Sequence, residues 1–277
     1  MRFPDAIRTA SQGLVAAKFR SFLTILGIVI GIASVILLMS IGKSAEKLIV
    51  RQIEDIGSNL IFVLPGATKG SRFASPPSLQ GVVTKTLVER DVDAFRREPG
   101  IAGVAPAVGG QARVSYANND TTVTYNGVTA EFFEVRNFDV SSGATFTERA
   151  VPSFQRVAVL GMEISKTLFG SSDPVGKTLR LKGIAFRVVG VLEAKGIGPG
   201  GVDQDNLILV PLTVAQKQLL GVDYYSVIFI QGSGEYSSEF VKGRVVAILR
   251  QNHRISDPSK DDFTIRTQED ALSLLGN

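Results

Sequence analysis

The strongest pattern in this chain is a run of uncharged, mostly apolar residues near its N-terminus. Residues 22–41 read FLTILGIVIGIASVILLMSI and contain no charged side chain. A helix of about 20 residues rises about 30 Å, which matches the thickness of the hydrocarbon core of a bilayer. The pattern therefore predicts a transmembrane helix over residues 22–42.

Two other interpretations of this run remain open. A buried core helix of a soluble protein is usually shorter or amphipathic, whereas this run is apolar all round. A cleaved signal peptide has an apolar region of about 7–15 residues and ends at a small-residue cleavage site. Here the run is longer, and the residues after it, 42–46, continue as a helix. A retained membrane helix is the favoured interpretation.

Amphipathic segments flank the predicted membrane helix on both sides. In residues 1–21, apolar side chains recur at helical spacing, which predicts a helix lying in the cytoplasmic membrane interface. In residues 43–57 the same spacing predicts a stalk that continues the membrane helix and stops at Gly57. A helical stalk can carry a tilt or a shear from the membrane to a domain, which a flexible linker cannot do.

Small residues lie along one face of the predicted membrane helix. Gly27 and Gly31 form a G-x-x-x-G pair, and Ser34 extends the same face. A face of small residues lets a second helix approach closely, and close packing holds helices together in lipid. Glycine is also common in membrane helices generally, so the pair has a second explanation. We predict that these three residues form a membrane-helix packing face.

Residues 58–267 are predicted to form a domain of mixed strands and helices. Predicted strands cover residues 59–64, 101–108, 112–116, 121–125, 155–160, 178–181, 184–192, 207–210, 226–230 and 263–266. Predicted helices cover residues 163–169 and 238–251, and residues 66–81 and 196–201 are predicted loops. The elements mix without a regular βαβ repeat, which favours the α+β class.

Two further helices are predicted from local signals. Thr86 and Glu89 fit a capping box that opens a helix, and Val88, Val92 and Phe95 lie on its apolar face. Residues 268–277 begin a helix at the end of the chain, which we interpret as the start of a truncated second stalk.

The distribution of charge agrees with a membrane protein and not with a nucleic-acid binder. The chain has 30 Lys and Arg and 26 Asp and Glu, a net charge of +4, and most of this excess lies in residues 1–21. A nucleic-acid-binding protein would gather basic residues on its folded domain. Basic residues before the span favour an N-terminus in the cytoplasm and residues 43–277 outside it. We predict the bilayer, and no nucleic acid, as a partner.

The composition excludes several kinds of functional site. There is no cysteine, which excludes disulfides, thiolate metal sites and a cysteine nucleophile. A single histidine, His253, excludes a multi-histidine metal site, and at a helix end it is interpreted as solvated or interacting with the helix dipole. Asp203-Gln204-Asp205 is interpreted as a turn rather than a cation site.

A partial match to a nucleotide-binding motif lacks one of the required glycines. Gly176-Lys177-Thr178 matches the end of a Walker A loop, but the required upstream glycine is replaced by Ser171. A Walker A loop opens a helix, whereas a strand is predicted after Lys177. We therefore predict no catalytic residue, no cofactor and no metal ion, and a protein that is not an enzyme.

Several short motifs together resemble those of MacB-type ABC transporter permeases. Residues 18–35, KFRSFLTILGIVIGIASV, resemble the first membrane helix of that family. The other motifs that carry the resemblance, in the family's order, lie at residues 56–59, 131–133, 156–161, 168–170, 173–177 and 188–191. The resemblance implies a bacterial inner-membrane protein whose periplasmic core domain has a porter-like subdomain of βαβ character and a β-rich subdomain.

The resemblance also implies a function and partners. Family members export peptides, antibiotics or lipoproteins, and couple ATP-driven motion in the cytoplasm to the periplasm without catalysis by the permease. The implied partners are a separate cytoplasmic ABC ATPase, the remaining permease helices or a second permease copy in a dimer, a periplasmic adaptor and an outer-membrane channel.

The family has three further membrane helices after the core domain, whereas this chain stops at Asn277. We therefore expect a fragment, a truncated gene or one half of a split permease. Three other functions stay open: a single-span extracytoplasmic binding or regulatory module controlling an envelope enzyme, a cleaved and secreted domain, and an enzyme.

Overall fold

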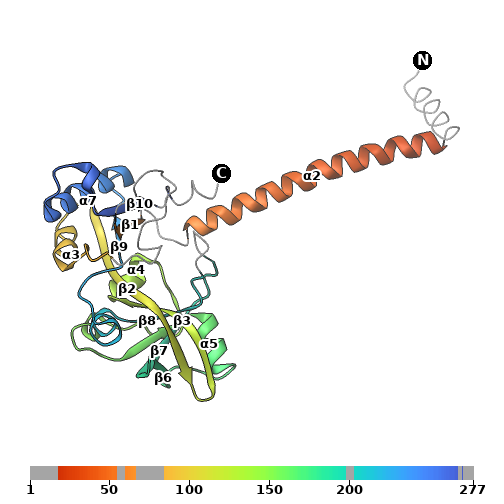
Figure 1. Ribbon diagram of the computed structural model, residues 1–277. Coiled ribbons are helices and arrows are strands. Elements are labelled where there is room, and N and C mark those ends of the chain that lie inside the picture. Colours follow the sequence, from red (N-terminus) through yellow and green to blue (C-terminus); the bar gives the residue numbers. More distant parts are fainter. Residues whose placement is uncertain (1–17, 55–59, 67–83, 198–202, 268–269, 271–277) are drawn as a thin grey trace. The chain divides into compact units, whose positions relative to one another are not determined.

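The computed structural model describes most of the chain in two compact units, residues 1–51 and 52–277. The described residues are 18–54, 60–66, 84–197, 203–267 and 270. Helix α2 (Lys18–Glu54) is one continuous helix of 37 residues (Figure 1). It includes the whole predicted membrane span and most of the predicted stalk. Residues 1–17, with most of the predicted interfacial helix, lie outside the described residues.

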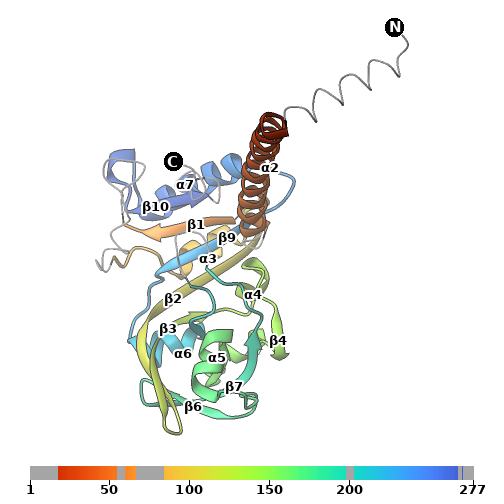
Figure 2. The same ribbon diagram turned by 90° about the vertical axis from the view of Figure 1, so that its right-hand side faces the viewer.

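The second unit begins and ends in a four-stranded antiparallel sheet that carries two helices. Its elements are β1 (Leu60–Pro65), α3 (Glu89–Phe95), β2 (Ile101–Tyr116), β9 (Val227–Gly232), α7 (Ser238–His253) and β10 (Phe263–Thr267). The strand order is β10-β1-β9-β2, and every neighbouring pair is antiparallel (Figure 2). This βαββαβ arrangement is the ferredoxin-like split βαβ motif. It agrees with the βαβ subdomain that the sequence resemblance implied.

The two faces of this sheet are buried by different elements. Because side chains alternate along a strand, Ile61 and Val63 of β1 join one core cluster with α3 and α7. Phe62, between them, joins a second cluster with α4 (Glu131–Val135). The helices therefore cover one face, and α4 with the residues that follow it covers the other.

The middle of the chain forms a β-rich subdomain whose strand pairing closes into a ring. Its strands are β3 (Asn119–Val128), β8 (Leu207–Pro211), β5 (Val157–Leu160), β7 (Ile184–Leu192) and β6 (Thr178–Leu181), together with β2. Each pairs with the next in that order, and β6 pairs with β2 through Val114↔Leu181 and Ser115↔Arg180. A closed ring leaves few free strand edges.

Shorter elements complete the β-rich subdomain. Strand β4 (Val140–Gly143) pairs with β7, and α5 (Met162–Phe169) packs on β3. The remaining helical segments are η2 (Glu148–Ala150), α6 (Leu212–Val214), the π-helical η4 (Ala215–Leu220) and η5 (Pro258–Lys260). The sequence predicted neither α4 nor β4 nor η4, because each is short or irregular.

One strand differs clearly from its prediction. Residues 101–108 and 112–116 were predicted as two strands, but they form the single strand β2 through Gly109 and Gly110. A Cβ atom on Gly109 would lie 2.2 Å from Asn126 Oδ1 and 3.0 Å from the Tyr125 carbonyl oxygen. Here glycine permits a close approach to β3 and does not interrupt the strand.

The predicted cap of α3 is also wrong. The helix begins at Glu89, and Asp91 accepts a hydrogen bond from the Val88 N–H at 3.0 Å. Thr86, the predicted capping residue, instead donates to the Asp262 carbonyl oxygen at 3.1 Å. A tertiary contact with the start of β10 therefore takes the hydroxyl that the local pattern assigned to the helix.

The other predicted strands and helices of the described residues are confirmed to within a few residues. The predicted loop over residues 66–81, most of the loop over 196–201 and the predicted helix at 268–277 lie largely outside the described residues. Together the two subdomains give a mixed α and β fold that follows one N-terminal apolar helix.

Candidate functional site

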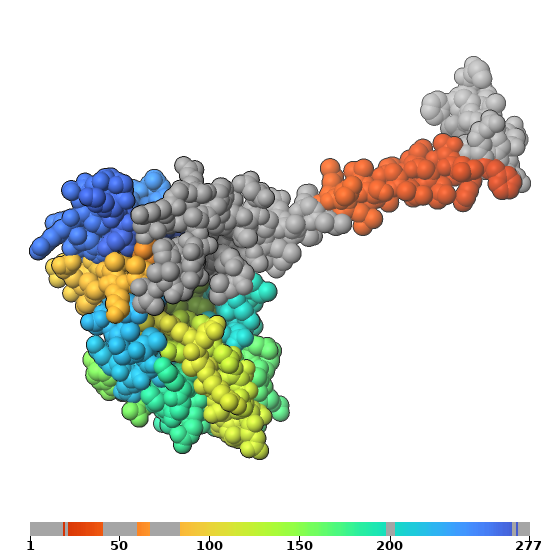
Figure 3. Space-filling model, viewed as in Figure 1, coloured from red at the N-terminus to blue at the C-terminus, as the bar shows by residue number. Residues whose placement is uncertain are grey.

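The first candidate site is the apolar part of α2. Residues 22–40 form the one helix among the described residues that is long and apolar enough to cross a membrane. Its large apolar side chains, including Leu37 and Leu38, are exposed on this helix, which is drawn in orange-red in Figure 3.

The three predicted packing residues share one face of this helix. Gly27, Gly31 and Ser34 are spaced at i, i+4 and i+7, and a Cβ atom added to either glycine meets nothing within 4 Å. The Ser34 hydroxyl donates to the Ile30 carbonyl oxygen at 2.8 Å within the helix. The hydroxyl is therefore hydrogen-bonded within the helix. The predicted contribution of Ser34 to the packing face is its small size, not a hydrogen-bond donor.

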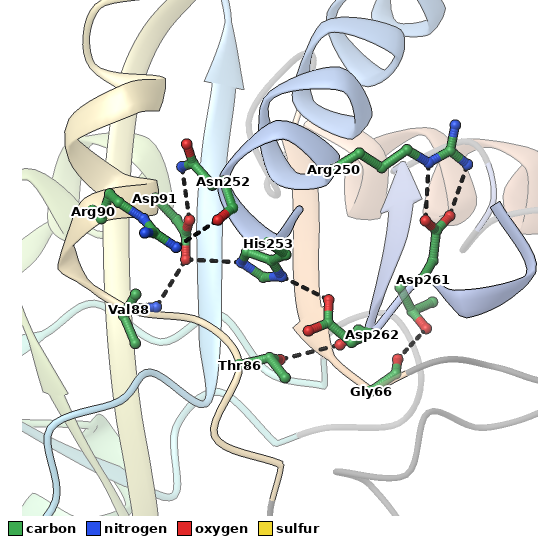
Figure 4. Close-up of polar contacts among 11 residues, drawn as sticks. Gly66, Thr86, Val88, Arg90, Asp91, Arg250, Asn252, His253, Asp261 and Asp262 are labelled. Carbon is green, nitrogen blue, oxygen red and sulfur yellow. Dashed lines mark hydrogen bonds and ion pairs between the residues drawn. The ribbon is translucent and has the colours of Figure 1, made fainter. Parts of the chain in front are cut away.

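The second candidate site is a buried polar cluster around the single histidine (Figure 4). The His253 side chain, at the end of α7, is 6% exposed and lies between two carboxylates. Its Nδ1 atom is 2.6 Å from Asp262 Oδ1, just before β10, and its Nε2 atom is 3.3 Å from Asp91 Oδ2 in α3. One imidazole therefore connects three elements of the ferredoxin-like subdomain.

Asp91 is the most deeply buried member of the cluster, with a side chain that is 0% exposed. Besides His253 it accepts hydrogen bonds from the Val88 N–H at 3.0 Å and from Asn252 Nδ2 at 2.8 Å. The same carboxylate thus caps the N-terminus of α3 and holds the C-terminus of α7. Arg250 and Asp261 form a bidentate ion pair beside the cluster, at 2.9 and 2.8 Å.

The cluster shifts the pKa values of its members in opposite directions. The hydrogen bond with Asp91 raises the pKa of His253, burial opposes this, and the hydrogen bond with Asp262 raises it further. Burial raises the pKa of Asp91, but its hydrogen bonds from His253, Val88 and Asn252 outweigh burial and lower that pKa overall. Both shifts favour a charged His253–Asp91 pair.

The arrangement does not provide a catalytic base. Both imidazole nitrogens face carboxylates, so neither is free to take a proton from a hydroxyl. The nearby hydroxyl of Thr86 donates to the Asp262 backbone. We therefore interpret the cluster as a structural junction. The interpretation of His253 as solvated is wrong, because its side chain is 6% exposed. Its partner Asp91 is 162 residues away in sequence, so no local pattern reveals the contact.

Two other sequence candidates have ordinary structural roles. Asp203 and Asp205 accept backbone hydrogen bonds within their loop, Asp203 from Asp205 N–H at 2.8 Å and Asp205 from Lys195 N–H at 2.8 Å. Among the described residues, no group of three or more His, Cys, Asp or Glu side chains could hold a metal ion. Lys177 is followed by strand β6, as predicted, and its Nζ atom lies 5.5 Å from the Phe169 ring centroid.

A known family of periplasmic domains matches most of this chain. The model of a family described as the MacB-like periplasmic core domain matches residues 21–248. The chain belongs to this family. The membership confirms the resemblance inferred from the short sequence motifs. A MacB-like periplasmic core domain with one N-terminal apolar helix is consistent with placement in an inner membrane.

Relatives of this MacB-like chain match it along its length. The macrolide export ATP-binding/permease protein MacB of Chlorobium luteolum is 32% identical over 276 residues, 100% of this chain and 41% of that relative. The MacB protein of Azoarcus sp. is 33% identical over 272 residues, 98% of this chain and 39% of that relative. The chain therefore spans about two fifths of the length of the curated relatives that it matches.

Solved structures share the MacB-like fold. The periplasmic region of MacB from Actinobacillus actinomycetemcomitans has a TM-score of 0.67 at 22% identity, over 83% of this chain and 98% of that structure. The extracellular domain of the noncanonic ABC-type transporter YknZ from Gram-positive bacteria has a TM-score of 0.58 at 21% identity, over 75% of this chain and 99% of that structure. At these identities the likeness shows the fold alone.

The histidine cluster predicts a dependence of stability on pH. A raised pKa in the folded chain means that protonated His253 stabilises the fold below about pH 6.5, the unfolded value. This contribution disappears as the pH rises through the higher folded value. We expect the melting temperature of the full chain in detergent to fall over that pH range. His253→Gln should remove this step, and should cost about 1–3 kcal/mol at pH 6 because it leaves Asp91 without its charged partner.

The matched control for this experiment is Gln251→Ala, which changes an exposed neighbour on the same helix. It should keep both the stability and the pH step of the unmodified chain. Because the chain has one histidine, the step has no other histidine source. An unchanged pH profile in His253→Gln would contradict the assignment.

Proposed function

We propose that the chain is the membrane-anchored periplasmic core portion of an ABC-type export permease. In this proposal it does not catalyse a reaction. It couples ATP-driven motion in the cytoplasm to the handling of cargo or partners in the periplasm, for efflux or for lipoprotein or peptide export. The observation that carries the proposal is the pairing of the first and last strands of the domain.

Strands β1 and β10 are hydrogen-bonded neighbours, with Ile61 opposite Thr267. The N-terminal end of β1 and the C-terminal end of β10 therefore lie side by side. Helix α2 ends at Glu54, only a few residues before β1 begins at Leu60. A displacement of the membrane helix would thus reach the domain at β1, next to its last strand β10.

This geometry suits mechanical coupling because the two elements that would carry the force, α2 and β1, are stiff. A continuous helix of 37 residues transmits displacement along its axis, unlike a flexible linker. Strand β1 is hydrogen-bonded on both sides, to β9 and β10, so a force on it is shared by the sheet. The proposed stalk over residues 43–57 would deliver that force to the proposed core domain over residues 58–267.

The proposal specifies a topology and partners. The N-terminus lies in the cytoplasm, residues 22–42 cross the inner membrane, and residues 43–277 lie in the periplasm. A separate cytoplasmic ABC ATPase supplies the energy. The remaining permease helices or a second permease copy complete the membrane part, and a periplasmic adaptor and an outer-membrane channel extend the export path.

The proposed transport function is tested by affinity purification of the full chain. The tagged chain, expressed with its genomic neighbours in native membranes, should recover an ABC ATPase and a permease partner. The control is an unrelated single-span membrane protein with the same tag. Recovery of neither component would contradict the proposal, and recovery of an envelope enzyme without an ATPase would favour a regulatory module.

The proposed topology is tested with protease on cells from which the outer membrane has been removed. Protease should digest the domain after residue 52 while a cytoplasmic marker in the same cells stays intact. The predicted span should also keep the chain in the membrane fraction. Complete protection of the domain, or recovery of the chain in the aqueous fraction, is incompatible with this topology.

The proposed packing face is tested by crosslinking between chains in membranes. Leu38→Cys places a reporter on the face of Gly27 and Gly31, in a chain with no other cysteine. Replacing both glycines with Ile should lower the yield of disulfide-linked dimer several-fold, because the added side chains keep two helices apart.

The matched control is the pair Val29→Ile and Ala33→Ile, which adds bulk at the same spacing on the opposite face. This control should leave the yield of dimer unchanged. Equal yields in the glycine variant and the control would show that the small residues do not mediate association.

A further inference from the structure

Arg136 lies at the junction of the two subdomains, in contact with aromatic rings of the ferredoxin-like sheet. It follows α4 directly, and its guanidinium carbon is 5.0 Å from the ring centroid of Phe229 and 5.7 Å from that of Phe62. Both rings lie on the sheet face that α3 and α7 leave uncovered, and both are partly exposed. The guanidinium thus rests on a small aromatic surface.

The hydrogen bonding of this guanidinium is incomplete. The Nη2 atom donates to Gln204 Oε1 at 3.3 Å, a long hydrogen bond. The Nε and Nη1 atoms are buried and have no hydrogen-bond partner in the part of the chain that the structure describes. None of the ion pairs among the described residues includes Arg136. A buried cation without an anion is costly, so its retention calls for an explanation.

Two other arginines of the same domain each form two hydrogen bonds with a carboxylate. Arg244 donates to both carboxylate oxygens of Glu98, at 2.8 and 3.0 Å, and Arg250 binds Asp261 in the same way. Burial lowers the pKa of Arg136 to about 10, so it remains charged at neutral pH. The Lys195 Nζ atom donates to the Arg136 carbonyl oxygen at 3.1 Å and adds a second positive charge nearby.

We propose that Arg136 anchors a binding site for a small amphiphilic anion. A carboxylate or phosphate group of the ligand accepts hydrogen bonds from Nε and Nη2, the edge on which Gln204 now binds Nη2, and its apolar part contacts the partly exposed rings of Phe62 and Phe229. The entering oxygen displaces the weakly held amide of Gln204.

The chemistry of the residues defines this ligand class. An arginine on aromatic rings suits a carboxylate or a phosphate joined to an apolar group. Because Nε and Nη1 are buried, a ligand reaches the guanidinium only when the Gln204 side chain moves aside, which a small group allows and the flat surface of a folded protein does not. The charges of Arg136 and Lys195 disfavour a cationic ligand. The inference is independent of the proposed transport function, since no ATPase is needed to measure binding.

The test measures binding of three small probes to the full chain in phosphatidylcholine nanodiscs by ligand-observed NMR. The probes are 4-phenylbutyrate, phenyl phosphate and the neutral 4-phenylbutanamide. We expect at least one anion to bind with a dissociation constant of about 1 mM, as suits ligands of this size, and the amide to bind at least tenfold more weakly. Which anion binds identifies the preferred oxyanion.

Variants distinguish a binding role from a structural one. Arg136→Met should weaken anion binding at least tenfold while keeping a melting temperature equal to or above that of the unmodified chain, because it removes an unpaired buried charge. The control Arg149→Met removes the same charge from an exposed side chain and should bind as before. Arg136→Lys keeps the charge without the guanidinium and should bind threefold to tenfold more weakly.

Several results would overturn the inference. These are binding of neither anion, equal binding of the amide and the anions, and unchanged binding in Arg136→Met. If Arg136→Met does not fold, the premise that this charge is dispensable for folding is wrong. The binding role is then tested with Arg136→Lys. Binding of the anions by this variant equal to that of the unmodified chain would refute the role of the Arg136 guanidinium.

Discussion

The folded domain depends on one long strand, β2, whose backbone N–H and C=O groups form hydrogen bonds with three different strands. Residues 101–107 of β2 pair with β9, residues 107–116 pair with β3, and residues 114–115 also pair with β6. The first pairing builds the ferredoxin-like sheet and the other two close the β-rich ring. Because buried backbone groups need partners, a break in β2 would separate the subdomains and expose both.

A shared strand also joins the two subdomains within one compact unit. The two hydrophobic clusters lie on opposite faces of the sheet, and β2 contributes Val104 to one and Ala105 to the other. The His253 cluster then fixes α3, α7 and β10 on one face, while α4 and Arg136 occupy the other. The sheet is therefore packed on both of its faces.

The sequence predicted those features that depend on nearby residues. The apolar helix followed from the absence of charge in residues 22–42, and most strands followed from runs of β-branched and apolar residues. Features set by distant residues gave no such signal. Thr86 bonds to Asp262 rather than capping its own helix, His253 meets Asp91 from another helix, and Arg136 lies on rings from two strands. The MacB resemblance predicted a domain of two subdomains, but it predicted none of these contacts.

The position of β1 in the sheet has a consequence for how the domain is synthesised. Both of its neighbours, β9 and β10, are encoded about 160 residues or more further along the chain. At about 5–20 residues per second, β1 waits on the order of 10–30 s for its first partner. Throughout that interval a short apolar strand with two bare edges is available to any other nascent chain. Strand β1 therefore joins its sheet only near the end of the synthesis of the domain.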